Sequence, residues 1–282
     1  MEEMKRNSGQ ALLIILLVMA VGLTIGLAIV SRSVTDITIS RQEEESARVF
    51  SVAEAGIEEA LKAGASFPAE GIEVPLEGVT ATVRKSDLGG QLEFAFPGEY
   101  VAGNIETLWL VAHEEDGDLN LGNPPSRYSN NSIEVYWGKE SGTIVPSLEA
   151  TLIYNQSGTK IIRWALDPDS SRGATNKFDL ADLGSFRIGE KTFRYKKTLN
   201  LPCGESGVIC YALRLRLLYN DQPQILGVKG VNNIPKQGVC YESTATLGGG
   251  GITRKVRQCQ FYKAPVGIFD YVLYSRGDLR KE

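Results

Sequence analysis

The chain has 282 residues, of which 43% are hydrophobic and 23% are charged, values typical of a globular protein with a sizeable core. Thirty Lys and Arg against 34 Asp and Glu give a net charge of −4, so the composition offers no signal for binding nucleic-acid phosphates. The single histidine, His113, excludes metal sites and reactions that need two imidazole groups.

The first predicted element is a long apolar helix near the N-terminus. No charged residue lies between Arg6 and Arg32, and residues 11–30 include one polar side chain, that of Thr24. Twenty helical residues span about 30 Å, the thickness of a bilayer's hydrocarbon core. Because Lys5 and Arg6 precede the run, the charge distribution predicts a cytoplasmic N-terminus and an exported remainder, in a protein that crosses the inner membrane once.

Three roles fit this segment: a cleaved signal peptide, an uncleaved signal anchor, or a helix that is kept after a short basic leader is removed. Gly26 and Ala28, on either side of Leu27, are small enough for a signal-peptidase site, but the apolar run exceeds the roughly 7–15 residues that signal peptides use. The following residues favour the third role. They contain no Pro or Gly from 31 to 55, and Gly64 stands where a helix would stop.

The continuation is predicted to be an amphipathic helix of about eight further turns. Its apolar stripe repeats every four residues, which is the spacing of one helix face. The stripe consists of Val49, Ala53, Ile57 and Leu61.

Two segments resemble type IV pilin-like proteins. Residues 8–14 read SGQALLI before the apolar run, as in a prepilin cleavage region, and residues 48–58 read RVFSVAEAGIE. The second segment is similar to the A-F-x-x-A-E-A-x-x-x-E stretch of PilX-type minor pilins and of minor pseudopilins of type II secretion. The resemblance covers about the first sixty residues. It implies a leader at residues 1–9, cleavage between Gly9 and Gln10 by a membrane prepilin peptidase, and a helix at residues 10–63 that packs with other pilins.

One position departs from that family. Most major pilins carry Glu at the fifth residue of the mature chain, where it is thought to neutralise the amine of a neighbouring subunit. Counting from Gln10, this position is Ile14. The departure favours a place at or near the filament tip, where one neighbour is missing.

Residues 72–282 are expected to form an exported, antiparallel, β-rich region, either one sandwich-like domain or two small β-modules, so the fold class is α+β. Short apolar or alternating runs are separated by Gly, Pro, Asn and Asp. The runs are 74–83, 92–96, 107–112, 133–137, 148–154, 160–165, 192–199, 211–219, 225–231, 239–247 and 252–262. In the run 211–219, three leucines are expected to face the core and Arg214 and Arg216 the solvent. Residues 269–274 are expected to form a last core strand or an exposed edge that binds a partner pilin.

Four cysteines follow the helix, and an even number in an exported region predicts disulfides. Three pairings are possible. We favour Cys203–Cys210, which closes a tight loop, and Cys240–Cys259, which ties a hairpin whose turn is residues 248–251.

No sequence motif supports catalysis, and His113 has no accompanying partner pattern, so the protein is not expected to be an enzyme. Acidic residues at 114–118 make Asp116, Asp118 and Asn120 candidate ligands for Ca²⁺, although the spacing is not that of an EF-hand and a solvated loop is the simpler interpretation. Asp167 and Asp169 are interpreted as turn residues.

These patterns favour a minor pilus or pseudopilus subunit with a structural or adhesive role at the cell surface. Its helix would lie in membrane lipid before assembly. Two alternatives remain: a signal-anchored β-sandwich that binds a glycan or protein, and an exported hydrolase with an unrecognised site.

Overall fold

The structure, a computed structural model, describes residues 8–114, 117–122, 126–248 and 251–267. One long N-terminal helix precedes a β-rich, antiparallel region, which confirms the α+β prediction. The chain divides into two compact units, Met1–Arg84 with Glu242–Arg257 and Lys85–Tyr241 with Gln258–Glu282. The backbone passes from one unit to the other within three strands, β2, β15 and β16.

The first unit contains helix α1 (Ser8–Ala63), the short 3₁₀ turn η1 (Gly64–Ser66) and, in part, a four-stranded sheet whose strands β2, β15 and β16 also have residues in the second unit. Helix α1 is uninterrupted because its sequence contains no proline. It ends where Gly64 adopts a φ of +51°, a left-handed conformation that glycine accepts without steric cost. The strand order is β1 (Ile72–Leu76), β2 (Val79–Gly89), β15 (Lys236–Leu247) and β16 (Thr253–Phe261).

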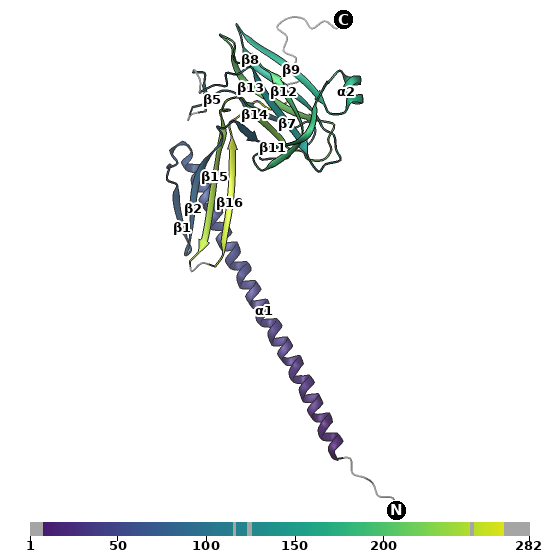
Figure 1. Cartoon of the computed structure of the whole chain (residues 1–282). Coiled ribbons are helices and arrows are strands. Elements are labelled where there is room, and N and C mark those ends of the chain that lie inside the picture. Colours follow the sequence, from purple (N-terminus) through teal and green to yellow (C-terminus); the bar gives the residue numbers. More distant parts are fainter. Residues whose placement is uncertain (1–7, 115–116, 123–125, 249–250, 268–282) are drawn as a thin grey trace, which may run out of the picture. The chain divides into compact units, whose positions relative to one another are not determined.

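The last turns of α1 lie against this sheet (Figure 1). Three members of the predicted stripe are buried, while Leu61 lies at the margin of the buried face and is only half-buried. The buried apolar side chains of this face are Val49, Val52, Ala53, Ile57 and Ala60. Several of these contacts involve alanines or glycine, which lets the helix backbone approach the sheet closely.

The second unit contains two five-stranded sheets, one two-stranded pair and a short helix. The first sheet has the order β10 (Asp179–Leu180), β9 (Thr159–Asp167), β8 (Ser147–Asn155), β13 (Ile209–Leu218) and β4 (Ile105–Trp109). The second has the order β11 (Asp182–Ile188), β12 (Lys191–Asn200), β7 (Ser132–Lys139), β14 (Leu226–Gly230) and β3 (Glu93–Ala95). The pair is β5 (Ala112–His113) with β6 (Leu119–Asn120), and the helix is α2 (Ser170–Asn176). Among the described strands of this unit, only β10 and β9 run parallel.

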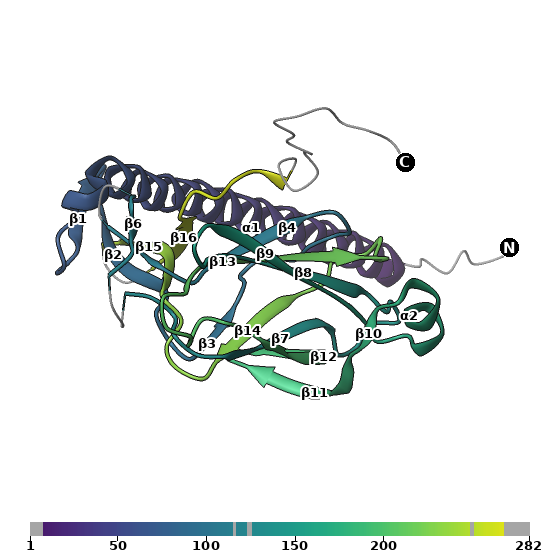
Figure 2. The ribbon, with the colours of Figure 1, turned by 90° about the horizontal axis from the view of Figure 1, so that it is seen from above.

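Both five-stranded sheets, shown in Figure 2, contribute side chains to one hydrophobic core. The core-facing positions alternate along the strands, as a strand with one buried face requires. In β7 they include Val135 and Trp137, and in β13 they include Leu213, Leu215 and Leu217. The indole N–H of Trp137 donates to the carbonyl oxygen of Pro146 at 2.8 Å, so the largest buried ring leaves no polar group unpaired.

Two features of this unit differ from the sequence prediction. Helix α2 and strand β11 have no apolar periodicity: α2 buries one residue, Gly173, and most of β11 is exposed, so neither produced a signal. Arg214 is 4% exposed rather than solvent-facing, because β13 lies between two strands whose residues Thr151 and Thr107 flank it in register. The predicted strand at 269–274 lies outside the described residues.

Candidate functional site

The N-terminal part of α1 presents an apolar surface that the described chain leaves uncovered. Its large hydrophobic side chains from Leu12 to Ile39 are between 48% and 68% exposed. Among the described residues, α1 has the length and hydropathy to cross a membrane, and its most apolar window has no buried residue. Gly9 and Gln10, the expected processing residues, lie in the first turn of this helix.

Three threonines within this part of the helix have hydrogen bonds of their own. The hydroxyl of Thr24 donates to the carbonyl oxygen of Val21 at 2.8 Å. Those of Thr35 and Thr38 donate to carbonyl oxygens one turn earlier, each at 2.9 Å. Because these bonds are internal, the hydroxyls need no water, which suits a helix surrounded by lipid or by other apolar helices.

The four cysteines form the two pairs that the sequence favours. Cys203, in the connection after β12, is joined to Cys210 near the start of β13, and Cys240 is joined to Cys259, which ties β15 to β16. Both pairs lie in the second unit. Their side chains are therefore committed to covalent links and are not available as metal ligands.

The candidate Ca²⁺ ligands are only partly described. Asp116 lies outside the described residues, and Asp118 is exposed. The oxygen of Asn120 accepts a hydrogen bond from the backbone N–H of Gly122 at 2.9 Å, while its amide nitrogen donates to Glu114. Within the described ranges, no group of three His, Cys, Asp or Glu side chains could hold a metal ion. The Ca²⁺ site stays a prediction.

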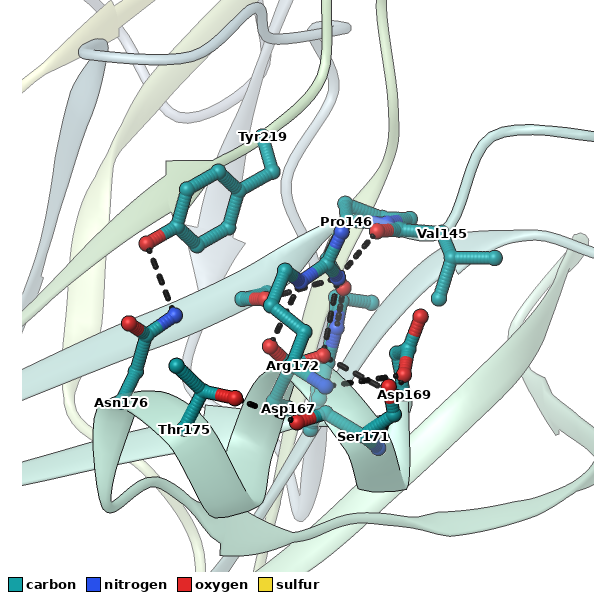
Figure 3. Close-up of polar contacts among 11 residues, drawn as sticks. Val145, Pro146, Asp167, Asp169, Ser171, Arg172, Thr175, Asn176 and Tyr219 are labelled. Atoms are coloured by element: carbon teal, nitrogen blue, oxygen red, sulfur yellow. Dashed lines mark hydrogen bonds and ion pairs between the residues drawn. The ribbon is translucent and has the colours of Figure 1, made fainter.

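A dense polar cluster surrounds Arg172 on helix α2, and Figure 3 shows its contacts. The guanidinium donates to both carboxylate oxygens of Asp167, at 2.7 and 2.8 Å, in a two-pronged ion pair. It also donates to the carbonyl oxygen of Val145 at 2.7 Å and lies 4.6 Å from the ring centre of Tyr219. Asp169 caps α2 by accepting from the backbone N–H of Arg172 and of its predecessor.

This cluster corrects the interpretation of Asp167 as a simple turn residue. Its side chain is fully buried, and its partner is five residues ahead. Burial alone would raise the pKa of Asp167, but hydrogen bonds from Arg172, from the backbone of Asp169 and from Ser147 outweigh it and lower that pKa. The cluster therefore holds a charged pair that fastens α2 to the end of β9, which is a structural role.

His113 lies in an aromatic stack. Its ring lies 4.0 Å from that of Tyr262 in a parallel arrangement and 4.7 Å from Trp109 edge-on. Burial lowers the pKa of the imidazole, so it is mostly neutral near pH 7. His113 and Tyr262 line a pocket of about 380 Å³ together with Ser126 and Lys236. Lys236 is paired with Asp87 at 2.7 Å, so its charge is already matched.

Glu106 is the carboxyl group with the largest upward shift in pKa among the described residues. It lies on β4 beside Leu215 of β13, in the row of positions that faces the core. Burial raises the pKa of its carboxyl to about 7. No sequence pattern indicated this, because the shift comes from burial, which arises only when β4 packs in the folded sheet.

Comparison with known proteins identifies no relative, so a function has to be argued from the features described above. No family model, no curated protein and no solved structure matches the chain.

Proposed function

We propose that the protein is a minor subunit of a type IV pilus or related pseudopilus. Its N-terminal helix lies in membrane lipid before assembly and among the helices of other pilins afterwards. The observation that carries the proposal is the continuity of α1, which is apolar and uncovered over its first half and packed under its own sheet over its last turns. A cleaved signal peptide would have no reason to continue into a folded unit.

The β-rich region is the exported part in this proposal, displayed at the cell surface for other pilins or for an extracellular target. Two disulfides support an oxidising compartment. The proposal includes a sandwich-like packing of the two five-stranded sheets, supported by the core that they share. It assigns the chain a structural and adhesive role and no reaction. Calcium binding near Asp118 is a separate prediction, which titration calorimetry of the purified chain would test.

Processing by the prepilin peptidase is the sharpest test, because it separates a pilin from a signal-anchored module. The peptidase is expected to need a small residue before the cut. Replacement Gly9→Val should therefore block removal of residues 1–9 while leaving membrane insertion intact. The matched control is Gly22→Val, since Gly22 lies inside the apolar run and a Cβ atom added there would meet no other atom within 4 Å.

Intact mass of the membrane-extracted chain is the measurement, in cells with and without the peptidase. We expect a mature start at Gln10 for the wild type and for Gly22→Val, and an uncut chain for Gly9→Val or without the peptidase. A mature start near residue 29 would instead identify a signal peptide. An uncut wild-type chain in peptidase-positive cells would identify an ordinary signal anchor.

A further inference from the structure

Two Asn-x-Ser triplets occur in the chain, at residues 130–132 and 155–157, and neither has proline in the middle. Such triplets are acceptors for oligosaccharides in exported proteins when the asparagine lies on an accessible loop. Both asparagines are half-buried, but the structure distinguishes the two sites. The triplet 155–157 lies at a hairpin tip with its serine exposed, whereas residues 130 and 131 are hydrogen-bonded to other segments of the chain.

The triplet 155–157 forms the tip of the hairpin between β8 and β9. Asn155 is the last residue of β8 and pairs with Thr159, so the loop between them has three residues. The side-chain oxygen of Asn155 accepts from the backbone N–H of Gly158 at 3.2 Å, which turns the loop tightly. Asn155 is half-buried, whereas Ser157 and Gly158 are exposed, and no atom lies within 4 Å of the position of a side chain at Gly158.

The other triplet is held by several bonds. The amide nitrogen of Asn130 donates to the side-chain oxygen of Asn232 at 2.6 Å. Asn131 accepts from the backbone N–H groups of Leu201 and Gly204, at 2.7 and 2.8 Å. Ser132 is the first residue of β7. The triplet 130–132 is thus bonded to two other segments of the chain, at residues 201–204 and at Asn232, which restricts how its backbone can rearrange in a transferase site.

We propose that Asn155 is a site of N-linked glycosylation. The donor is an oligosaccharide linked to a lipid through a phosphate or pyrophosphate group. A C–N bond forms between the anomeric carbon and Nδ2 of Asn155 as the C–O bond to the lipid phosphate breaks. The phosphate leaves with the electron pair, and Nδ2 loses one proton to a base of the transferase.

The modified residue remains compatible with the fold. Nδ2 of Asn155 carries two hydrogens, and one of them is donated to the hydroxyl of Tyr211 at 3.2 Å. Glycosylation replaces the second hydrogen, so this bond and the turn bond to Gly158 both persist. Because Ser157 and Gly158 beside it are exposed, the tip offers room for the oligosaccharide.

Glycosylation of Asn155 in cells rests on the export proposed above. The test is therefore done in vitro, where export plays no part. The full chain, purified in detergent, is incubated with an oligosaccharyltransferase that reads three-residue acceptors and with its lipid-linked oligosaccharide. Intact mass and peptide mapping then locate the product. We expect one oligosaccharide per chain, on the peptide that contains Asn155.

Three variants sharpen the result. Asn155→Gln and Ser157→Ala should each abolish the mass increase, and Ser157→Ala does so while keeping the amide of Asn155. Asn130→Gln should leave the increase unchanged. Modification at Asn130 alone, or none at all, overturns the proposal whether or not residues 1–9 are removed in cells. Glycosylation of Asn155 in vitro supports the glycosylation proposal even if residues 1–9 are retained in cells. The glycosylation proposal and the pilin proposal can therefore fail independently.

Discussion

Gly56 of helix α1 lies so close to Ser243 of strand β15 that a Cβ atom at position 56 would be 2.5 Å from the Ser243 hydroxyl oxygen. The same atom would lie 2.9 Å from a methyl group of Val83. Ser243 is fully buried, and its hydroxyl has no hydrogen-bond partner among the described residues. Glycine at this position therefore sets how closely the helix can approach its sheet.

Replacement of Gly56 by Ala should destabilise the first unit, because the added methyl group overpacks the interface. We expect a loss of about 1–3 kcal/mol in the free energy of unfolding, measured by denaturant titration in detergent. Ser243→Ala removes one of the two clashing atoms and should recover part of the loss in the double variant. Gly22→Ala is the control, since that position is open. Equal stability of Gly56→Ala and wild type would show that helix α1 and strand β15 are not closely packed at this position.

Local patterns predicted the elements better than the contacts between them. The stripe that includes Val49 and Ile57 identified the buried face of α1, because helical periodicity is a local property. The close approach at Gly56 could not be predicted, because it depends on Ser243, which is nearly two hundred residues away. Asp167 illustrates the same limit: its position before Pro168 indicates a turn, but not that its side chain is buried in an ion pair with Arg172.

The Asp167–Arg172 pair should make the second unit less stable in acid. The pKa of Asp167 is lowered in the folded protein, so its stabilising contribution is present above the unfolded value of about 3.9 and is lost as the pH falls through the folded pKa. Unfolding of wild type and Asp167→Asn between pH 7 and pH 2 measures this. The variant should be less stable at pH 7, and the difference should shrink in acid. A constant difference would contradict the assignment.

Removing the cation tests the same pair from the other side. Arg172→Met leaves a buried carboxylate without its partner, which typically costs roughly 3–5 kcal/mol in the free energy of unfolding. We expect the low end, because the arginine side chain is 27% exposed. Lys177→Met, on the exposed residue that follows α2, is the control and should change stability little.

Glu106 should have the opposite pH dependence. Its folded pKa is raised to about 7 by burial, so folding opposes ionisation of this carboxyl. The penalty is absent below the unfolded pKa, grows as the pH rises from about 4.5, and is complete above pH 7. Glu106→Gln should therefore raise stability at pH 8 and have a smaller effect at pH 5. Denaturant midpoints at the two pH values check this, with exposed Glu190→Gln as the control.

The two disulfides should differ in their effect on stability. Cys240 and Cys259 are separated by 19 residues, so their link should contribute about 3 kcal/mol by restricting the unfolded chain. Cys203 and Cys210 are separated by seven and should contribute less. Replacing each pair by serine and comparing denaturant unfolding tests the order. A larger loss for the shorter loop would mean that native packing around it dominates.

The last prediction concerns copy number and rests on Ile14. In the proposed filament, the amine of each mature N-terminus is buried among apolar helices and needs a carboxylate partner. Leaving it unpaired costs several kcal/mol. Ile14 supplies no carboxylate, so each inserted copy leaves one neighbouring amine uncompensated. The chain should therefore be rare in filaments, located at one end, and unable to polymerise alone. Asp36 is a poor substitute, since 22 helical residues place it about 33 Å further along α1.

Quantitative mass spectrometry of sheared filaments measures this copy number. Ile14→Glu should raise the number of copies per filament, because it restores the missing partner for the amine. Ile15→Glu is the matched control: it adds the same charge one residue later, on a side chain of similar exposure, 57% against 55%. That charge lies about 100° away around the helix, so it cannot replace the carboxylate at position 14. If the wild-type chain is the most abundant subunit, the tip assignment is wrong. If both variants raise the copy number equally, general charge rather than pairing with the amine controls incorporation.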